Sequence, residues 1–91
     1  MLTARQFVVF GRVHGVGFRF FAEDAAVREG LSGWVLNRPD GTVEVHAEGE
    51  KEAVDRFERA LGSGPPGARV ERIEVAEGQP EGRVTGFHIR G

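Results

Sequence analysis

The stretch from Ser32 to Glu48 reads SGWVLNRPDGTVEVHAE, with a strand pattern on either side of a turn. Its first part, Ser32–Asn37, has the apolar centre of a short strand, and Thr42–Glu48 alternates apolar and polar residues as a half-buried strand does. Between them, Asp40-Gly41 is a typical hairpin turn. The sequence therefore predicts a hairpin whose second strand turns Val43, Val45 and Ala47 inward and Thr42, Glu44, His46 and Glu48 outward.

Helical periodicity flanks this hairpin on both sides. Apolar residues recur at helical spacing from Phe18 onward, and Gly30 is the predicted C-terminal cap of that helix. A second helix is predicted over Glu50–Leu61 and stops at the Gly/Pro-rich residues 62–67. The seven phenylalanines are expected to lie mostly in the core. Further strands are predicted over Gln6–Val13, over Ala68–Val75 with a bulge, and over Gly86–Arg90.

The order of these elements predicts an α+β, ferredoxin-like βαββαβ sandwich. We expect an antiparallel sheet with two helices packed on one face, plus a short fifth C-terminal strand. The chain of 91 residues has the length of one domain, so residues 1–91 are expected to fold as a single unit. Because this fold carries many functions, the function has to be argued from particular residues.

Composition narrows the range of functions. The net charge is −2, with 12 Lys+Arg against 14 Asp+Glu, which argues against a nucleic-acid or membrane surface but leaves room for a pocket for one anion. The chain has no cysteine, which excludes disulfides, thiolate metal sites and cysteine nucleophiles. No signal-peptide pattern and no long apolar run are present, so we expect a cytoplasmic protein. The three histidines lack a metal-binding spacing, so neither metal nor cofactor is expected.

The chemically most informative stretch runs from Gly11 to Arg19, between a predicted strand and a predicted helix. Its glycines allow positive φ angles and a close ligand approach, and the free N–H groups at a helix start favour an anion. Arg19 could grip two phosphate oxygens in a fork. For glycines alone, a plain turn with a solvated arginine is the competing interpretation. The predicted phosphate-binding loop comprises His14, Gly15, Val16, Gly17, Phe18 and Arg19.

Residues 11–19 read Gly-Arg-Val-His-Gly-Val-Gly-Phe-Arg, which resembles the acylphosphatase signature Gly-Arg-Val-Gln-Gly-Val-Gly-Phe-Arg. A second motif of that family, Gly-Trp-Val-x-Asn followed by Asp-Gly-Thr-Val, stands at residues 33–37 and 40–43. The ending Phe87–Arg90 also fits, so the resemblance covers almost the whole chain. Two departures are visible: His14 replaces the usual Gln, and Leu36 replaces a residue that is often Arg.

The resemblance implies an acylphosphatase, a hydrolase acting on phosphorus-containing anhydrides. It would cleave the carboxyl–phosphate bond of small acyl phosphates without metal or cofactor, with inorganic phosphate as product and inhibitor, as a monomer. The resemblance implies that Arg19 binds the phosphate and that Asn37 orients the attacking water. Such an anhydride needs positioning and charge stabilisation more than a strong base. Asparagine before a turn is often only a local cap, however. We expect His14 to donate a hydrogen bond to the loop or to substrate, as Gln could.

Two alternatives stay open. One is an acylphosphatase-like module for carbamoyl phosphate, as in maturation factors that carry this domain at one end; the end of the chain at Gly91 disfavours it. The other is a ferredoxin-like module that binds RNA or a small effector, but an RNA-binding aromatic motif and a basic face are not evident. Trp34 could flank the site, although packing is its commoner role. Turnover of acetyl phosphate would separate the enzyme from the binding module.

Overall fold

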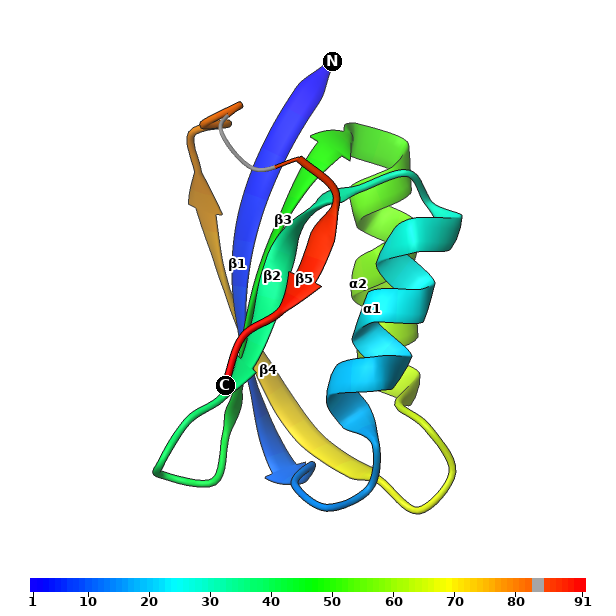
Figure 1. The fold of residues 1–91 in the computed structure, drawn as a ribbon, viewed down its shortest axis with the longest axis vertical. Helices are drawn as coiled ribbons and strands as arrows, with labels where there is room; N and C mark the ends of the chain where they lie inside the picture. Colours follow the sequence, from blue (N-terminus) through cyan, green and yellow to red (C-terminus); the bar gives the residue numbers. More distant parts are fainter. Residues whose placement is uncertain (83–84) are drawn as a thin grey trace.

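Two helices cover one face of a five-stranded sheet (Figure 1). The structure is a computed structural model that describes residues 1–82 and 85–91. This arrangement confirms the predicted ferredoxin-like α+β sandwich. The elements follow one another as β1 (Leu2–Arg12), α1 (Phe18–Arg28), β2 (Ser32–Asn37), β3 (Val43–Glu50), α2 (Lys51–Ser63), β4 (Arg69–Gly78) and β5 (Phe87–Ile89).

The strands lie in the order β4-β1-β3-β2-β5. Neighbouring strands are antiparallel except at one edge, where β5 runs parallel to β2 and pairs Phe87 with Gly33. The sheet is therefore mixed, whereas we expected it to be antiparallel throughout. The direction of β5 follows from the topology. β4 is antiparallel to β1 and therefore also to the direction of β2, and the chain reverses again after β4, so that β5 lies parallel to β2 on the far edge of the sheet (Figure 1).

The core lies between the sheet and the helices. The inward positions of β3 are confirmed, because Val43, Val45 and Ala47 are fully buried. Phe57 of α2 packs edge-on against Phe7 of β1, with ring centroids 5.9 Å apart. Gly30 follows α1 with a φ of 70°, in the left-handed conformation expected of a helix-ending glycine. The bulge is also confirmed, since the register between β1 and β4 shifts beside Phe10. Within the described residues, neither helix is long and apolar enough to cross a membrane.

The opposite face of the sheet is more covered than the alternation of β3 suggests. His46 and Glu48 do alternate with the core residues of β3, but only 5% and 8% of their surfaces are exposed. The ring of Trp34 stacks on His46, and the segment 79–82 hydrogen-bonds to Glu48 through two backbone N–H groups. The alternation predicts that His46 and Glu48 are solvated, but they are buried. The two-residue alternation of a strand shows which face a side chain is on, and it does not show what covers that face.

Candidate functional site

The loop between β1 and α1 ends in a glycine that caps the helix. Gly15 and Gly17 have φ angles of 73° and 77°, a left-handed backbone that side-chain-bearing residues rarely adopt. Gly17 is the N-cap of α1, so it offers no side-chain acceptor to the first helical N–H groups, and the first turn holds no acidic residue. The start of α1 therefore keeps both its free donors and the positive end of its dipole for an outside anion.

A cavity of about 110 Å³ opens at this helix start. It lies between the loop, the first turn of α1 and the last residue of β2, so the fold brings Arg19 and Asn37 to one place. Two predicted loop residues do not line it: Val16 packs against the core, and His14 bonds elsewhere. The lining residues are Val13, Gly15, Gly17, Phe18, Arg19, Phe20 and Asn37.

Arg19 supplies the positive charge of the cavity. It is half-buried, and no carboxylate of the described residues lies within ion-pair distance of its guanidinium. Arg5 and Arg56 are paired with acidic side chains, whereas Arg19, like Arg12 and Arg59, has no such partner among the described residues. The charge of Arg19 is therefore not neutralised by a neighbouring carboxylate, which is the condition that a site for an anion requires.

Asn37 is held in the cavity wall without a bond to its amide oxygen. Its Oδ1 is buried, and no described residue donates a hydrogen bond to it. The turn that follows is capped by Asp40 instead, whose Oδ1 accepts bonds from the backbone N–H and the hydroxyl of Thr42 at 3.0 and 2.6 Å. These two bonds hold the pKa of Asp40 below its usual range. Because Asp40 caps the turn, local capping does not explain Asn37.

His14 connects the loop to that same turn. Its Nε2 lies 2.8 Å from the carbonyl oxygen of Thr42, and because a carbonyl can only accept, the imidazole donates. We expected the donated bond to go to the loop itself or to substrate, and the structure directs it to the hairpin instead. The same carbonyl accepts the N–H of Arg38 at 2.9 Å. One oxygen therefore braces the loop against the residue that follows Asn37.

Phe20 lines the cavity although it was expected in the core. It is 67% exposed, whereas Phe18 at the start of the same helix is buried. Two helical positions correspond to a rotation of about 200°, so Phe20 points away from the side of α1 that meets the sheet. The signal was present in the sequence, since Phe20 falls outside the apolar stripe formed by Phe18, Ala22 and Ala25.

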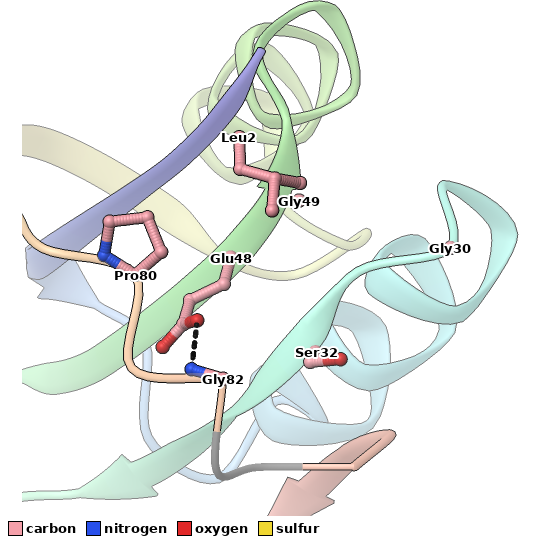
Figure 2. Close-up of a pocket in the computed structure, with 7 residues that line it drawn as sticks. All are labelled: Leu2, Gly30, Ser32, Glu48, Gly49, Pro80 and Gly82. Atoms are coloured by element: carbon pink, nitrogen blue, oxygen red, sulfur yellow. Dashed lines mark hydrogen bonds between the residues drawn. The ribbon is translucent and has the colours of Figure 1, made fainter.

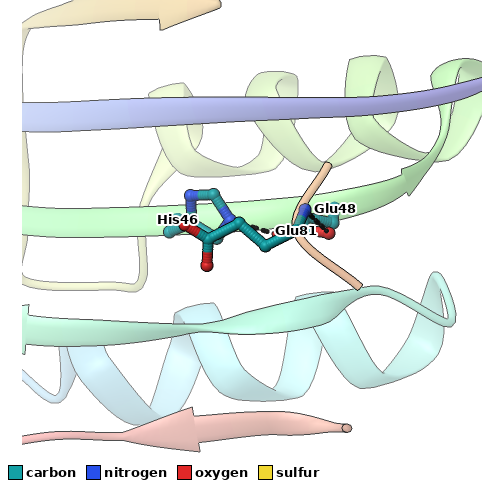
Figure 3. Close-up of side chains that lie close together, drawn as sticks. All are labelled: His46, Glu48 and Glu81. Carbon is teal, nitrogen blue, oxygen red and sulfur yellow. Dashed lines mark hydrogen bonds and ion pairs between the residues drawn. The ribbon is translucent and has the colours of Figure 1, made fainter. Parts of the chain in front are cut away.

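Outside this cavity, His46, Glu48 and Glu81 come together on the open face of the sheet (Figure 3). Their potential ligand atoms lie within 4.8 Å of one another, so the fold forms a cluster that the histidine spacing did not predict. Glu48 already accepts bonds from His46 Nε2 at 2.7 Å and from the N–H groups of Glu81 and Gly82 at 2.9 and 3.2 Å. A histidine that binds a metal through one ring nitrogen usually donates a hydrogen bond from the other nitrogen. The Nδ1 of His46 is buried and has no partner among the described residues, so this support is missing here.

The cluster is best described as a latch that ties the segment 79–82 to β3. A cavity of about 310 Å³ lies beside it, between the start of β2 and the end of β3 (Figure 2). Among the described residues of its lining, Glu48 alone is charged, and both of its carboxylate oxygens are already bonded within the latch. The described part of this second cavity therefore offers a ligand no uncommitted charge.

The aromatic rings of the open face are covered too. The Arg90 guanidinium lies 5.1 Å from the centroid of Trp34, and that of Arg72 lies 3.9 Å from the centroid of Phe10. Trp34 packs on His46 and is not among the residues that line the 110 Å³ cavity, so its packing role is confirmed. Rings covered by arginines do not form the free stacking platform that single-stranded RNA needs.

The comparisons with known proteins point to one family. The family described as Acylphosphatase matches residues 5–89. A curated acylphosphatase of Thermus thermophilus is 52% identical over 82 residues, which are 90% of this chain and 92% of that protein. The crystal structure of acylphosphatase from Bacillus subtilis matches all of both chains with a TM-score of 0.94 and 41% identity. Full-length HypF, in its phosphate- and nucleotide-bound form, matches with a TM-score of 0.91 and 34% identity, over 100% of this chain and 12% of that one.

Proposed function

The chain belongs to the acylphosphatase family, and we propose that it hydrolyses small acyl phosphates in the cavity at the start of α1. The products are a carboxylate and inorganic phosphate. The observation that carries the proposal is that Arg19 and Asn37, on separate elements, line one small cavity beside free helix N–H groups. Membership of the family makes the chain a hydrolase of acyl phosphates, and the roles of the individual residues are part of the proposal.

The phosphoryl group binds where Gly15 and Gly17–Arg19 of the loop line the cavity. Backbone N–H groups at the start of α1 and the guanidinium of Arg19 supply donors and positive charge for the three equatorial oxygens. The backbone N–H groups are positioned by the loop and the helix, so they can stabilise the charge that redistributes during phosphoryl transfer without reorganising. The uncompensated charge of Arg19 and the absence of acidic residues from the first turn of α1 support this assignment.

Asn37 orients the attacking water. An amide can donate and accept hydrogen bonds at once, and the Oδ1 of Asn37 has no donor among the described residues. The water oxygen bonds to phosphorus, and the phosphorus–oxygen bond to the acyl group breaks with its electron pair on the carboxylate. A carboxylic acid ionises at about pH 4, so the leaving group departs without a general acid. The proton of the water passes to the phosphate or to solvent.

Neither a metal ion nor a cofactor enters this proposal, because amides and Arg19 balance the charge. We also propose a monomer in the cytoplasm. One chain supplies Arg19, Asn37 and the helix N–H groups, so the proposed site needs no second copy, and a chain without cysteine needs no oxidising compartment. Inorganic phosphate is the product and occupies the phosphoryl position, so it acts as a competitive inhibitor.

The test is hydrolysis of acetyl phosphate by the purified chain in the presence of EDTA, with the loss of acetyl phosphate as the signal. We expect full turnover under chelation and competitive inhibition by inorganic phosphate. Activity that is lost in EDTA and restored by a divalent ion would overturn the metal-free mechanism. Purely noncompetitive inhibition by phosphate would place the phosphoryl site elsewhere.

Carbamoyl phosphate, the alternative substrate considered from the sequence, is a second candidate. It is also a mixed anhydride of phosphate, so the same cavity would hold its phosphoryl group and the two substrates differ only in the leaving group. Comparison of kcat/KM for carbamoyl and acetyl phosphate decides between them. A ratio well above one would favour the specialised module.

A further inference from the structure

Phe20 is the exposed apolar side chain in the lining of the proposed phosphoryl site. The other two apolar side chains there, Val13 and Phe18, are each only 1% exposed. Phe20 directly follows Arg19 in the first turn of α1 and leaves 67% of its surface in contact with water. It contributes to the wall of the cavity and to its outer surface at the same time.

The position of Phe20 matters because of where the acyl group has to go. With the phosphoryl group held by the loop and Arg19, the rest of the substrate must extend out of a cavity of about 110 Å³ toward solvent. An exposed apolar residue on its own needs no explanation. Here the exposed ring borders the route of the leaving group, so a substrate with an apolar acyl group can bury surface against it.

We propose that Phe20 determines specificity for the acyl group, favouring acyl phosphates with an aromatic or bulky apolar acyl group over acetyl phosphate. This proposal rests on the proposed function. The contact lies outside the bonds that change, so it forms equally in the bound substrate and in the transition state. Uniform binding of this kind lowers KM and leaves kcat unchanged.

The test compares the KM values for benzoyl phosphate and acetyl phosphate in the whole, unsubstituted chain and in the Phe20→Ala variant. Loss of a ring–ring contact should raise the ratio of the KM for benzoyl phosphate to the KM for acetyl phosphate by about three- to tenfold. Val27→Ala is the matched control, because Val27 is 62% exposed on the same helix and does not line the cavity. Phe20→Tyr keeps the ring and should keep the low KM for benzoyl phosphate.

The outcomes separate this proposal from the one on which it rests. If the whole chain hydrolyses both substrates and Phe20→Ala changes both KM values by the same factor, Phe20 does not select the acyl group and only shapes the loop. If Phe20→Tyr loses selectivity as fully as Phe20→Ala, the ring contact is wrong. If the whole chain hydrolyses neither substrate, the proposed function fails and the selectivity fails with it. Thermal melts of the variants check that folding is retained, as the exposure of Phe20 leads us to expect.

Discussion

The imidazole Nε2 of His14 donates a hydrogen bond of 2.8 Å to the carbonyl oxygen of Thr42, and this contact joins the two halves of the site. His14 belongs to the loop that leads to Arg19, while the Thr42 carbonyl also accepts the N–H of Arg38, directly after Asn37. The groups proposed to bind phosphate and to orient water are therefore braced against a single acceptor. His14 acts through this brace as a positioning residue.

Replacing His14 should affect turnover according to whether the new side chain can donate. Glutamine has an N–H that can reach a carbonyl, so His14→Gln should keep kcat/KM for acetyl phosphate within about twofold. His14→Ala leaves the loop unbraced, and loss of a bond of about 1 kcal/mol should lower kcat/KM by roughly five- to tenfold. Steady-state kinetics measure both variants, and equal losses in the two would show that the donated bond is not what matters.

Removal of Arg19 should weaken binding and turnover together. We propose that its guanidinium holds the phosphoryl group both in the bound substrate and in the transition state. Arg19→Ala should therefore raise the Kd of inorganic phosphate and lower kcat, and Arg19→Lys should rescue poorly because an ammonium lacks the planar fork. Calorimetry with phosphate and steady-state kinetics provide the two readouts. Arg12→Ala, in the exposed end of β1, is a matched control for loss of one positive charge.

Asn37→Ala should fail in a different way. Because Asn37 is proposed to hold the water and not the phosphate, kcat should fall by at least about a hundredfold while the affinity for phosphate stays nearly unchanged. A near-normal kcat would contradict the water-positioning role. Thermal melts show whether the fold persists; if Asn37→Ala unfolds, Asn37→Asp and Asn37→Ser replace it in the same measurements.

The fold could be predicted almost completely because its signals are local. The hairpin Ser32–Glu48 combines a turn signal with strict alternation, and both helices carry apolar stripes at the right spacing. The parallel pairing of β5 was not predicted, since three residues at the end of a chain do not specify which edge they join. That choice is made by the burial of Phe87 against Phe57, a contact between distant parts of the chain.

The site could be predicted only as far as motifs allow. The glycines and Arg19 indicated the phosphate-binding loop, and the family resemblance indicated Asn37 as a further site residue. That Arg19 and Asn37 line one cavity follows only from the folded structure. Sequence alone misplaced Phe20, because its residue type suggests a core position while its helical phase puts it outside. The sequence also could not predict the latch of His46 and Glu48, because segment 79–82 reaches Glu48 from far along the chain.

That latch predicts how stability depends on pH. Burial raises the pKa of Glu48, but hydrogen bonds from His46 and from the N–H groups of Glu81 and Gly82 outweigh burial and bring the pKa below its ordinary value of 4.5. Because the folded pKa is the lower one, the folded state binds fewer protons than the unfolded state does. The contribution of Glu48 is therefore fully present above pH 4.5 and is lost as the pH falls through the folded pKa.

Glu48→Gln should reveal this contribution as a pH-dependent difference in melting temperature. The amide oxygen of glutamine can still accept from the N–H groups of the segment, but it carries no charge, so the variant should melt several degrees below the unchanged chain at neutral pH. A shift of several degrees corresponds to about 1 kcal/mol in a domain of this size. The difference should shrink as the pH is lowered toward about 3. Glu44→Gln, on the same face of β3, is the matched control for loss of one carboxylate and should leave the neutral-pH melting temperature nearly unchanged. A difference for Glu48→Gln that stayed constant with pH would mean that the pKa of Glu48 is not lowered in the folded protein.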